Sequence, residues 1–84
     1  RKPEPVLAVL PFDNDSDEPE MDFFSDGVAD EIISTLLKHS KIKVIGRTSA
    51  FQFRGDRKTE AAAALNATHL LDGGVRCTKT ALRV

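Results

Sequence analysis

The sequence has neither tryptophan nor tyrosine, and it contains a single cysteine. Its large aromatic side chains are all phenylalanines, at Phe12, Phe23, Phe24, Phe51 and Phe53. Because Cys77 has no second cysteine to pair with, an internal disulfide is excluded. The cysteine content therefore gives no indication of an oxidising compartment.

Long apolar runs and an excess of either charge are also missing. No stretch approaches the roughly 20 apolar residues of a membrane span, so we expect no membrane insertion in this segment. No signal peptide opens the sequence. A net charge of −1 in 84 residues argues against a nucleic-acid partner. A chain of this length forms one domain at most. We expect a linker at residues 1–5 and a single α/β domain at residues 6–84, cut from a larger protein.

The first half of the chain predicts a strand, an acidic loop and a helix. Residues 6–12 (VLAVLPF) are almost continuously apolar, which is typical of a strand buried on both faces. An acidic loop without lysine or arginine follows. Apolar residues then recur with helical spacing and predict a wide stripe packed on a sheet. The stripe consists of Phe24, Val28, Ala29, Ile32, Ile33, Leu36 and Leu37. Asp22, Ser25 and Asp26 are candidate caps at the start of this helix.

The second half predicts further strands around a short helix. Residues 41–47 (KIKVIGR) indicate a strand parallel to the first, because a helix connects the two. A short helix is expected at residues 60–65, capped by Thr59 or Asp56 and ended by Asn66. A third strand begins near Ala67, and residues 78–80 turn the chain into a final strand at residues 81–84. Phe51 and Phe53 alternate, which places one side of their segment in the core. The fold class is α/β, with a β-α-β-α-β-β order.

One candidate binding site follows from this topology. In open α/β sheets, ligands bind beyond the carboxyl ends of parallel strands. Those ends bring together two polar groups, which are Asp13, Asn14 and Ser16 on one strand and Arg47, Thr48 and Ser49 on the next. Such a crevice suits a partner peptide or a small anion, with Arg47 as a bidentate donor. The alternative is that the first group turns the chain and caps a helix, while the charged side chains form a solvated surface.

The sequence gives no motif for catalysis, metal or cofactor binding. Residues 13–17 (DNDSD) imitate the start of a calcium loop, but Glu18 and Phe24 stand where that loop requires a glycine and a bidentate acid. His39 and His69 lack the spacing of zinc ligands. Cys77 has no base nearby in sequence. Neither a nucleophile elbow nor a glycine-rich phosphate loop occurs. We therefore expect no catalytic residue, no cofactor and no metal.

The order of several motifs resembles the TolB N-terminal-like domain family. That module occurs in bacterial adenylate or guanylate cyclase-like proteins and in tetratricopeptide and winged-helix regulators. The matching positions are Leu10-Pro11-Phe12, Asn14-Asp15-Ser16, Pro19-Glu20, Phe23-Phe24, Asp26-Gly27, Arg47-Thr48-Ser49, Phe51, Phe53, Gly55, Leu65, Leu71, Gly73, Val75 and Arg76. Departures from the family pattern are Glu18, Asn66, His69 and Gly74.

The resemblance implies a three-layer α/β/α domain with a mixed, mainly parallel sheet. This fold is similar to that of anticodon-binding domains, and the sequence is expected to stop before its last strand. It also implies a non-catalytic protein-interaction or regulatory module, with any cyclase chemistry in another domain. The expected partner is a protein or a neighbouring domain of the same chain, or a second copy that joins through an open sheet edge. A sensor of a small anion or nucleotide is the alternative. A cytoplasmic location would follow from a cyclase-like protein, and a periplasmic one from an envelope protein.

Overall fold

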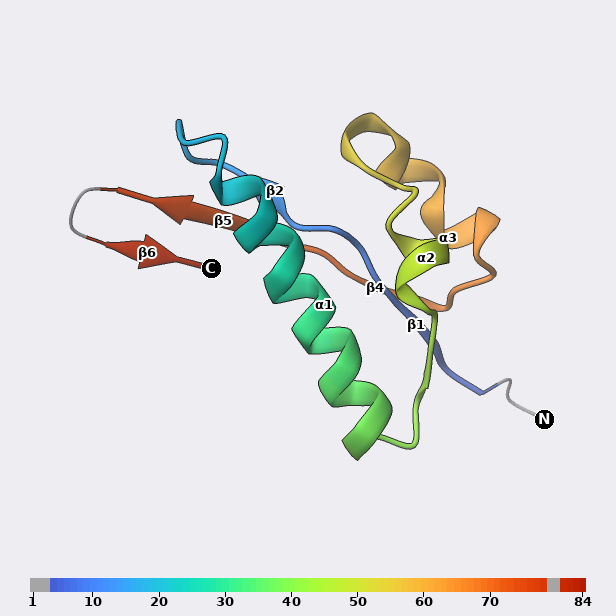
Figure 1. Cartoon of the computed structure of the whole chain (residues 1–84). Helices are drawn as coiled ribbons and strands as arrows, with labels where there is room; N and C mark the ends of the chain where they lie inside the picture. Colours follow the sequence, from blue (N-terminus) through green and yellow to red (C-terminus); the bar gives the residue numbers. More distant parts are fainter. Residues whose placement is uncertain (1–3, 79–80) are drawn as a thin grey trace.

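The chain has an α/β fold built around one long, bent pair of strands (Figure 1). The computed structural model describes residues 4–78 and 81–84. The predicted linker at 1–5 therefore lies mostly outside the described residues. Its described part, Glu4 and Pro5, is exposed coil. The elements, in chain order, are β1 (Val6–Val9), β2 (Asp13–Asn14), α1 (Met21–His39), β3 (Lys43–Val44), α2 (Arg47–Ala50), the 3-10 helix η1 (Gly55–Glu60), α3 (Ala61–Ala64), β4 (His69–Leu71), β5 (Gly74–Cys77) and β6 (Leu82–Arg83).

The strands form two three-stranded sheets, which backbone hydrogen bonds connect into a mixed, mainly parallel arrangement. Its first part has the order β3-β1-β4 and is parallel, with Leu7 opposite both Val44 and His69. In the second part, β2 pairs parallel with β5, and β5 pairs antiparallel with β6. Two backbone hydrogen bonds link the two parts. The amide of Leu10 donates to the carbonyl oxygen of Leu71 at 2.9 Å, and the amide of Asp13 donates to that of Gly73 at 3.0 Å. The strand is interrupted at Pro11, which has no amide hydrogen to donate to a ladder.

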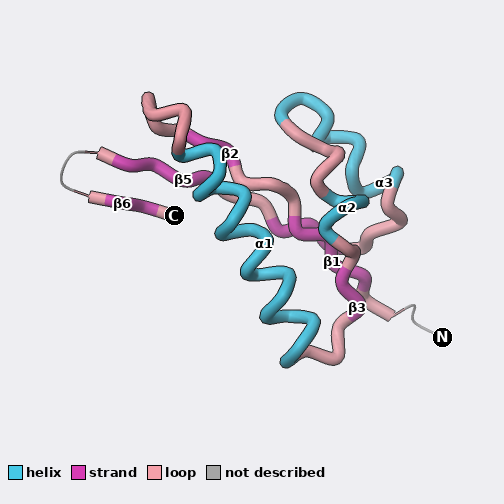
Figure 2. The backbone as a smooth tube through the Cα atoms, in the orientation of Figure 1, coloured by secondary structure: helices cyan, strands magenta, loops and turns pink. Residues whose placement is uncertain are grey.

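Helices flank the strands on two sides (Figure 2), with α1 on one side and α2, η1 and α3 on the other. Val9, the last residue of β1, and Leu10, which follows it, pack against the two layers in turn. Val9 packs in a cluster with Ala29 and Ile33 of α1. Its neighbour Leu10 packs in a second cluster with Phe53 and with Ala61 of α3. Successive side chains of a strand point to opposite faces, so these neighbours serve the two layers. The predicted three-layer α/β/α arrangement is thereby confirmed, and so is the strand buried on both faces.

The predicted core stripe of α1 is only partly correct. The fully buried line of this helix consists of Ser25, Ala29 and Ile33. Phe24 and Leu37 remain 41% and 59% exposed, although both belong to the expected stripe. The stripe is too wide for the described strands, so one of its flanks extends beyond them. The apolar pattern identified the helix correctly but overestimated how much of it is covered.

Several local expectations are corrected by the structure. The N-cap of α1 is Glu20, and no side chain caps the helix by hydrogen bond. The second strand is limited to Lys43–Val44, because α2 begins at Arg47. Neither η1 nor α3 has a side-chain cap. Phe51 and Phe53 do not share one side, since Phe51 packs against the α1 cluster and Phe53 belongs to the α3 cluster.

The end of the chain follows the prediction more closely. Asn66 has a φ of 54°, the left-handed conformation expected of a helix terminator. The final hairpin is present as β5 and β6, with Cys77 opposite Leu82. The turn expected at residues 78–80 includes Lys79 and Thr80, which lie outside the described residues. In the part of the chain that the structure describes, no helix is both long and apolar enough to cross a bilayer.

Candidate functional site

The loop after β2 is organised around the side chain of Asn14. Its side-chain nitrogen donates to the backbone oxygen of Glu18 and to the carboxylate of Asp22, and both donor–acceptor distances are 2.9 Å. Its side-chain oxygen accepts from the amide of Ser16, also over 2.9 Å. The hydroxyl of Ser16 accepts from the amide of Cys77. Asn14 thus forms an Asx turn that ties the loop to the first turn of α1, and Ser16 ties it to β5.

Asp13, the other predicted site residue of this loop, is engaged by Lys58. The ammonium of Lys58 lies 3.0 Å from Asp13 and 2.6 Å from Asp72, and its side chain is only 11% exposed. Burial lowers the pKa of Lys58, but the hydrogen bonds that its ammonium donates to Asp72 and Asp13 outweigh this effect and raise the pKa above the usual 10.5. Because Lys58 belongs to η1, these two hydrogen bonds connect the helical layer that contains η1 to the start of β2 at Asp13 and to the segment between β4 and β5 at Asp72.

The other half of the predicted site lies on α2. The guanidinium of Arg47 pairs with Asp30 over 3.7 Å and lies 5.0 Å from the ring centre of Phe51. The backbone oxygen of Thr48 accepts from the side-chain nitrogen Nε2 of Gln52, and Thr48 and Ser49 are both exposed. Each of these three residues is therefore accessible from solvent, with Arg47 held between an acid and an aromatic ring.

Different elements carry the two halves. β3 ends at Val44, opposite Leu7, and Arg47 begins α2, whereas Asp13 lies in β2, which pairs with β5. Among the described residues, no hydrogen bond or ion pair joins the first group to the second. The binding role assigned to these six residues stays a prediction.

A bidentate ion pair joins the two helical layers close to α2. Both terminal nitrogens of Arg54 donate to the carboxylate of Asp26, over 2.9 and 2.8 Å. The hydrogen bonds to Asp26 raise the pKa of Arg54, so this guanidinium is always charged. Arg54 also lies 5.5 Å from the ring centre of Phe51, which is the ring that Arg47 contacts. The sequence predicts Asp26 as a helix cap, but in the structure its carboxylate binds Arg54, which lies 28 residues further along the chain.

The acidic loop itself carries no metal arrangement. In residues 4–78 and 81–84, no group of three or more His, Cys, Asp or Glu side chains is placed to hold a metal ion. The Glu20 carboxylate raises the pKa of Glu18, because it can accept a hydrogen bond from protonated Glu18 and because its negative charge disfavours a second one. These acids therefore repel one another at the surface and do not converge on a common centre.

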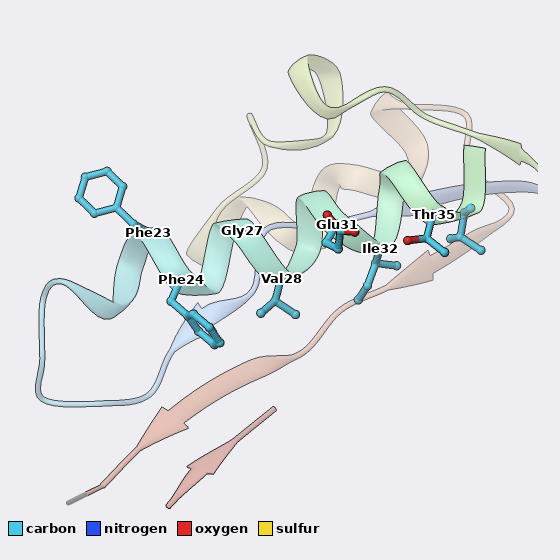
Figure 3. Close-up of a pocket in the computed structure, with 8 residues that line it drawn as sticks. Phe23, Phe24, Gly27, Val28, Glu31, Ile32 and Thr35 are labelled. Carbon is cyan, nitrogen blue, oxygen red and sulfur yellow. The ribbon is translucent and has the colours of Figure 1, made fainter. Parts of the chain in front are cut away.

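The sequence reasoning missed a groove along α1. It has a volume of about 760 Å³ and is lined by Phe23, Phe24, Gly27, Val28, Glu31, Ile32, Thr35 and Leu36. Figure 3 shows Phe24, Val28 and Ile32 projecting together toward the side of the β5–β6 hairpin, while Phe23 points away from it. One sequence feature could have indicated this groove: the apolar stripe of the helix is wider than a short sheet can cover.

Comparison with known proteins gives one informative match. The chain is 38% identical over 82 residues to "Putative adenylate cyclase 3" of Rhizobium meliloti (strain 1021). The aligned part is 95% of this chain but only 14% of that protein. No family model matches the sequence. No solved structure matches it either. The chain is thus similar to a small segment of a much longer cyclase-related protein.

Proposed function

We propose that this chain is a non-catalytic interaction and regulatory module of a larger, cyclase-like bacterial signalling protein. The observation that carries the proposal is the 38% identity to a segment that makes up 14% of an adenylate cyclase-related protein. A segment that small leaves most of such a protein for catalysis and other domains. The TolB N-terminal-like assignment belongs to the same proposal, supported by the motif order from Leu10-Pro11-Phe12 to Arg76.

The use of the carboxylates supports a non-catalytic role. Cyclase chemistry needs paired aspartates that hold metal ions close to the nucleotide phosphates. Four of the described aspartates are paired with cations that stabilise the fold. Asp13 and Asp72 bind Lys58, Asp26 binds Arg54, and Asp30 binds Arg47. Each of these pairs joins segments far apart in sequence, which is what a structural role requires.

Deletion in the full-length gene product tests this function. Removing residues 6–84 should leave the conversion of ATP to cyclic AMP measurable but change its rate or its response to conditions. The 84-residue chain alone should produce no cyclic AMP. A shortened protein that is folded, as judged by circular dichroism, but catalytically dead would contradict the proposal. So would a shortened protein whose cyclase activity and regulation match those of the full-length protein.

A further inference from the structure

The dipeptide Asp-Gly occurs twice in the chain, in two different surroundings. Asp26-Gly27 lies in the second turn of α1, and Asp72-Gly73 lies in the coil between β4 and β5. In this dipeptide the side-chain carboxyl group readily reacts with the next backbone amide, because glycine has no Cβ to hinder their approach. The two copies therefore compare the same chemistry in two conformations.

At Asp72 the reacting groups already lie in contact. The amide of Gly73 donates to Oδ1 of Asp72 at 2.7 Å, and the ammonium of Lys58 donates to the same oxygen at 2.6 Å. A carboxyl carbon lies about 1.2 Å from its oxygen, so Cγ of Asp72 is within about 4 Å of the nitrogen of Gly73. Productive encounters between reacting atoms begin at about 3–3.5 Å. Among the hydrogen bonds of the described residues, none reaches Oδ2, which is therefore the oxygen available to leave.

The packing around Asp72 also requires glycine at the next position. A Cβ on Gly73 would lie 3.3 Å from two ring atoms of Phe12. Phe12 is buried in the α1 cluster, so its ring has little room to move away. The fold thus keeps the least hindered residue next to Asp72, whose side chain is 45% exposed and accessible to water.

The other dipeptide is protected by its helix. In α1 the amide of Gly27 donates to the carbonyl oxygen four residues earlier. The carboxylate of Asp26 is bound by both terminal nitrogens of Arg54, and its side chain is only 25% exposed. Reaction between Asp26 and Gly27 would therefore require the helical turn to unwind and the ion pair to break.

We propose that Asp72 is a site of spontaneous isomerisation to isoaspartate, through a cyclic imide formed with Gly73. The nitrogen of Gly73 attacks Cγ of Asp72 and a C–N bond forms. The Cγ–Oδ2 bond breaks, and Oδ2 leaves as water with the carboxyl proton and the amide proton. A second water molecule then opens the five-membered imide. Attack at Cγ restores aspartate, whereas attack at the main-chain carbonyl carbon leaves the peptide linkage on the side chain. No atom is oxidised or reduced, and this chemistry does not depend on the proposed function.

Isomerisation adds one carbon to the backbone between β4 and β5. The carbonyl groups of Leu71 and Gly73 stand on either side of this point. They accept hydrogen bonds from the amides of Leu10 and Asp13. An extra bond of about 1.5 Å between the two carbonyls shifts one of them along the first strand. The carboxylate also moves away from Lys58, so the modified chain should be less stable than the parent.

Ageing of the folded chain tests this modification. The purified protein is incubated at physiological temperature and mildly acidic pH, and isoaspartate is located by proteolysis and fragmentation mass spectrometry. Isoaspartate at Asp72 should exceed that at Asp26 by at least about tenfold, because the helix holds the reacting atoms of Asp26 apart. In guanidinium chloride, where the fold is absent, the two sites should react at nearly equal rates.

Three results of the ageing experiment would overturn the proposal. The first is an absence of isoaspartate at Asp72 in the folded chain. The second is equal modification of Asp72 and Asp26 while circular dichroism shows a folded protein. The third is a rate at Asp72 that is much lower in the folded chain than in the unfolded one, since the coil would then protect this dipeptide as the helix protects the other.

Matched variants separate the role of the fold from that of the local sequence. Asp72→Asn and Asp26→Asn each replace an acid by an amide, which closes the same ring with loss of ammonia and gains mass on hydrolysis. Only Asp72→Asn should deamidate in the folded state, as followed by intact-mass spectrometry. Deamidation of Asp26→Asn at the same rate would overturn the proposal.

A conservative variant tests the consequence for the fold. Asp72→Glu keeps a carboxylate for Lys58 but could close only a six-membered ring, so its modification should be lost. After ageing, the parent should have a lower Tm than before, whereas Asp72→Glu should keep its initial value. An equal fall in Tm for both proteins would contradict the assignment of the damage to Asp72. An unchanged Tm for a parent that has largely isomerised would contradict the predicted effect on the fold.

Discussion

At the scale of single residues, Lys58 is the side chain that holds the most distant parts together. It belongs to η1 and bonds Asp13 on β2 and Asp72 between β4 and β5. Its own side chain is nearly buried, whereas the two acids are about half exposed. Partial exposure of the acids reduces the value of each pair through solvent screening. The combined contribution to stability is therefore moderate, although two bonds meet at one ammonium.

Removing this ammonium should destabilise the fold without changing its shape. Lys58→Gln is expected to lower the free energy of unfolding by about 1–2 kcal/mol, because Asp13 and Asp72 lose their cation. Urea denaturation followed by circular dichroism should show a lower midpoint with an unchanged slope. Lys43→Gln, at an exposed position of β3, is the control and should stay within about 0.5 kcal/mol of the parent. Equal midpoints for the two variants would mean that the paired bonds contribute nothing.

The raised pKa of Lys58 also predicts how stability depends on pH. A group whose pKa is higher in the folded state stabilises fully below its unfolded pKa, here about 10.5. That stabilisation is lost as the pH rises through the higher folded value. The difference in urea midpoint between the parent and Lys58→Gln should therefore be constant up to about pH 10 and shrink above it. No tyrosine titrates in this range, because the chain has none. A difference that grows above pH 10.5 would contradict the assignment.

At the scale of elements, the sequence predicted types well and boundaries less well. β1 and α1 were foreseen because an apolar run and a helical repeat are local signals that tertiary packing reinforced. The caps failed for a different reason. Asp26 has the right residue type for a cap, but its partner Arg54 is 28 residues away and only folding brings them together. The second strand ended early because α2 begins at Arg47, which a local pattern of alternation does not reveal.

The candidate site depended on the same boundary. Asp13 and Arg47 were expected side by side because both follow a predicted strand end. In the structure Asp13 lies in β2, which pairs with β5, whereas Arg47 begins α2. Register along a sheet is set by pairing between strands, and a single sequence carries little information about it. The groove on α1 was hidden for a related reason, since periodicity does not tell how wide the covering sheet is.

Two glycines in different elements should respond to alanine in opposite directions. Gly27 lies inside α1, and a methyl group there would meet no atom within 4 Å. Gly27→Ala should stabilise by about 0.5–1 kcal/mol through helix propensity, raising Tm by roughly 2–8 °C. Gly55 opens η1 with a φ of 55°, where alanine is strained. Gly55→Ala should lower stability by about 1 kcal/mol. Thermal denaturation by circular dichroism distinguishes the two, and a fall in Tm for Gly27→Ala would show that α1 bends or packs differently.

At the scale of the whole molecule, two cores on opposite faces share one strand. Val9 contributes to the α1 cluster and Leu10 to the α3 cluster, and these residues are adjacent. Arg54 and Lys58 add ionic ties from the second helical layer to α1 and to the sheet. Because β1 cannot leave one cluster and remain in the other, loss of either helical layer exposes both. A domain of this size should therefore unfold as one cooperative unit.

Weakening one layer should thus lower the stability of the other by the same amount. Ile33→Val removes one buried methylene from the α1 cluster and should cost about 0.5–1.5 kcal/mol. Amide resonances of Ala29 in α1 and Ala61 in α3 report the two layers separately during a urea titration. Both should lose their folded intensity at the same lowered midpoint, although Ala61 lies in the cluster that the substitution does not touch. Leu37→Val, on the exposed side of α1, is the control and should leave both midpoints near the parent values. A parent-like midpoint at Ala61 with a lowered one at Ala29 would show that the layers unfold independently, and that sharing β1 does not couple them.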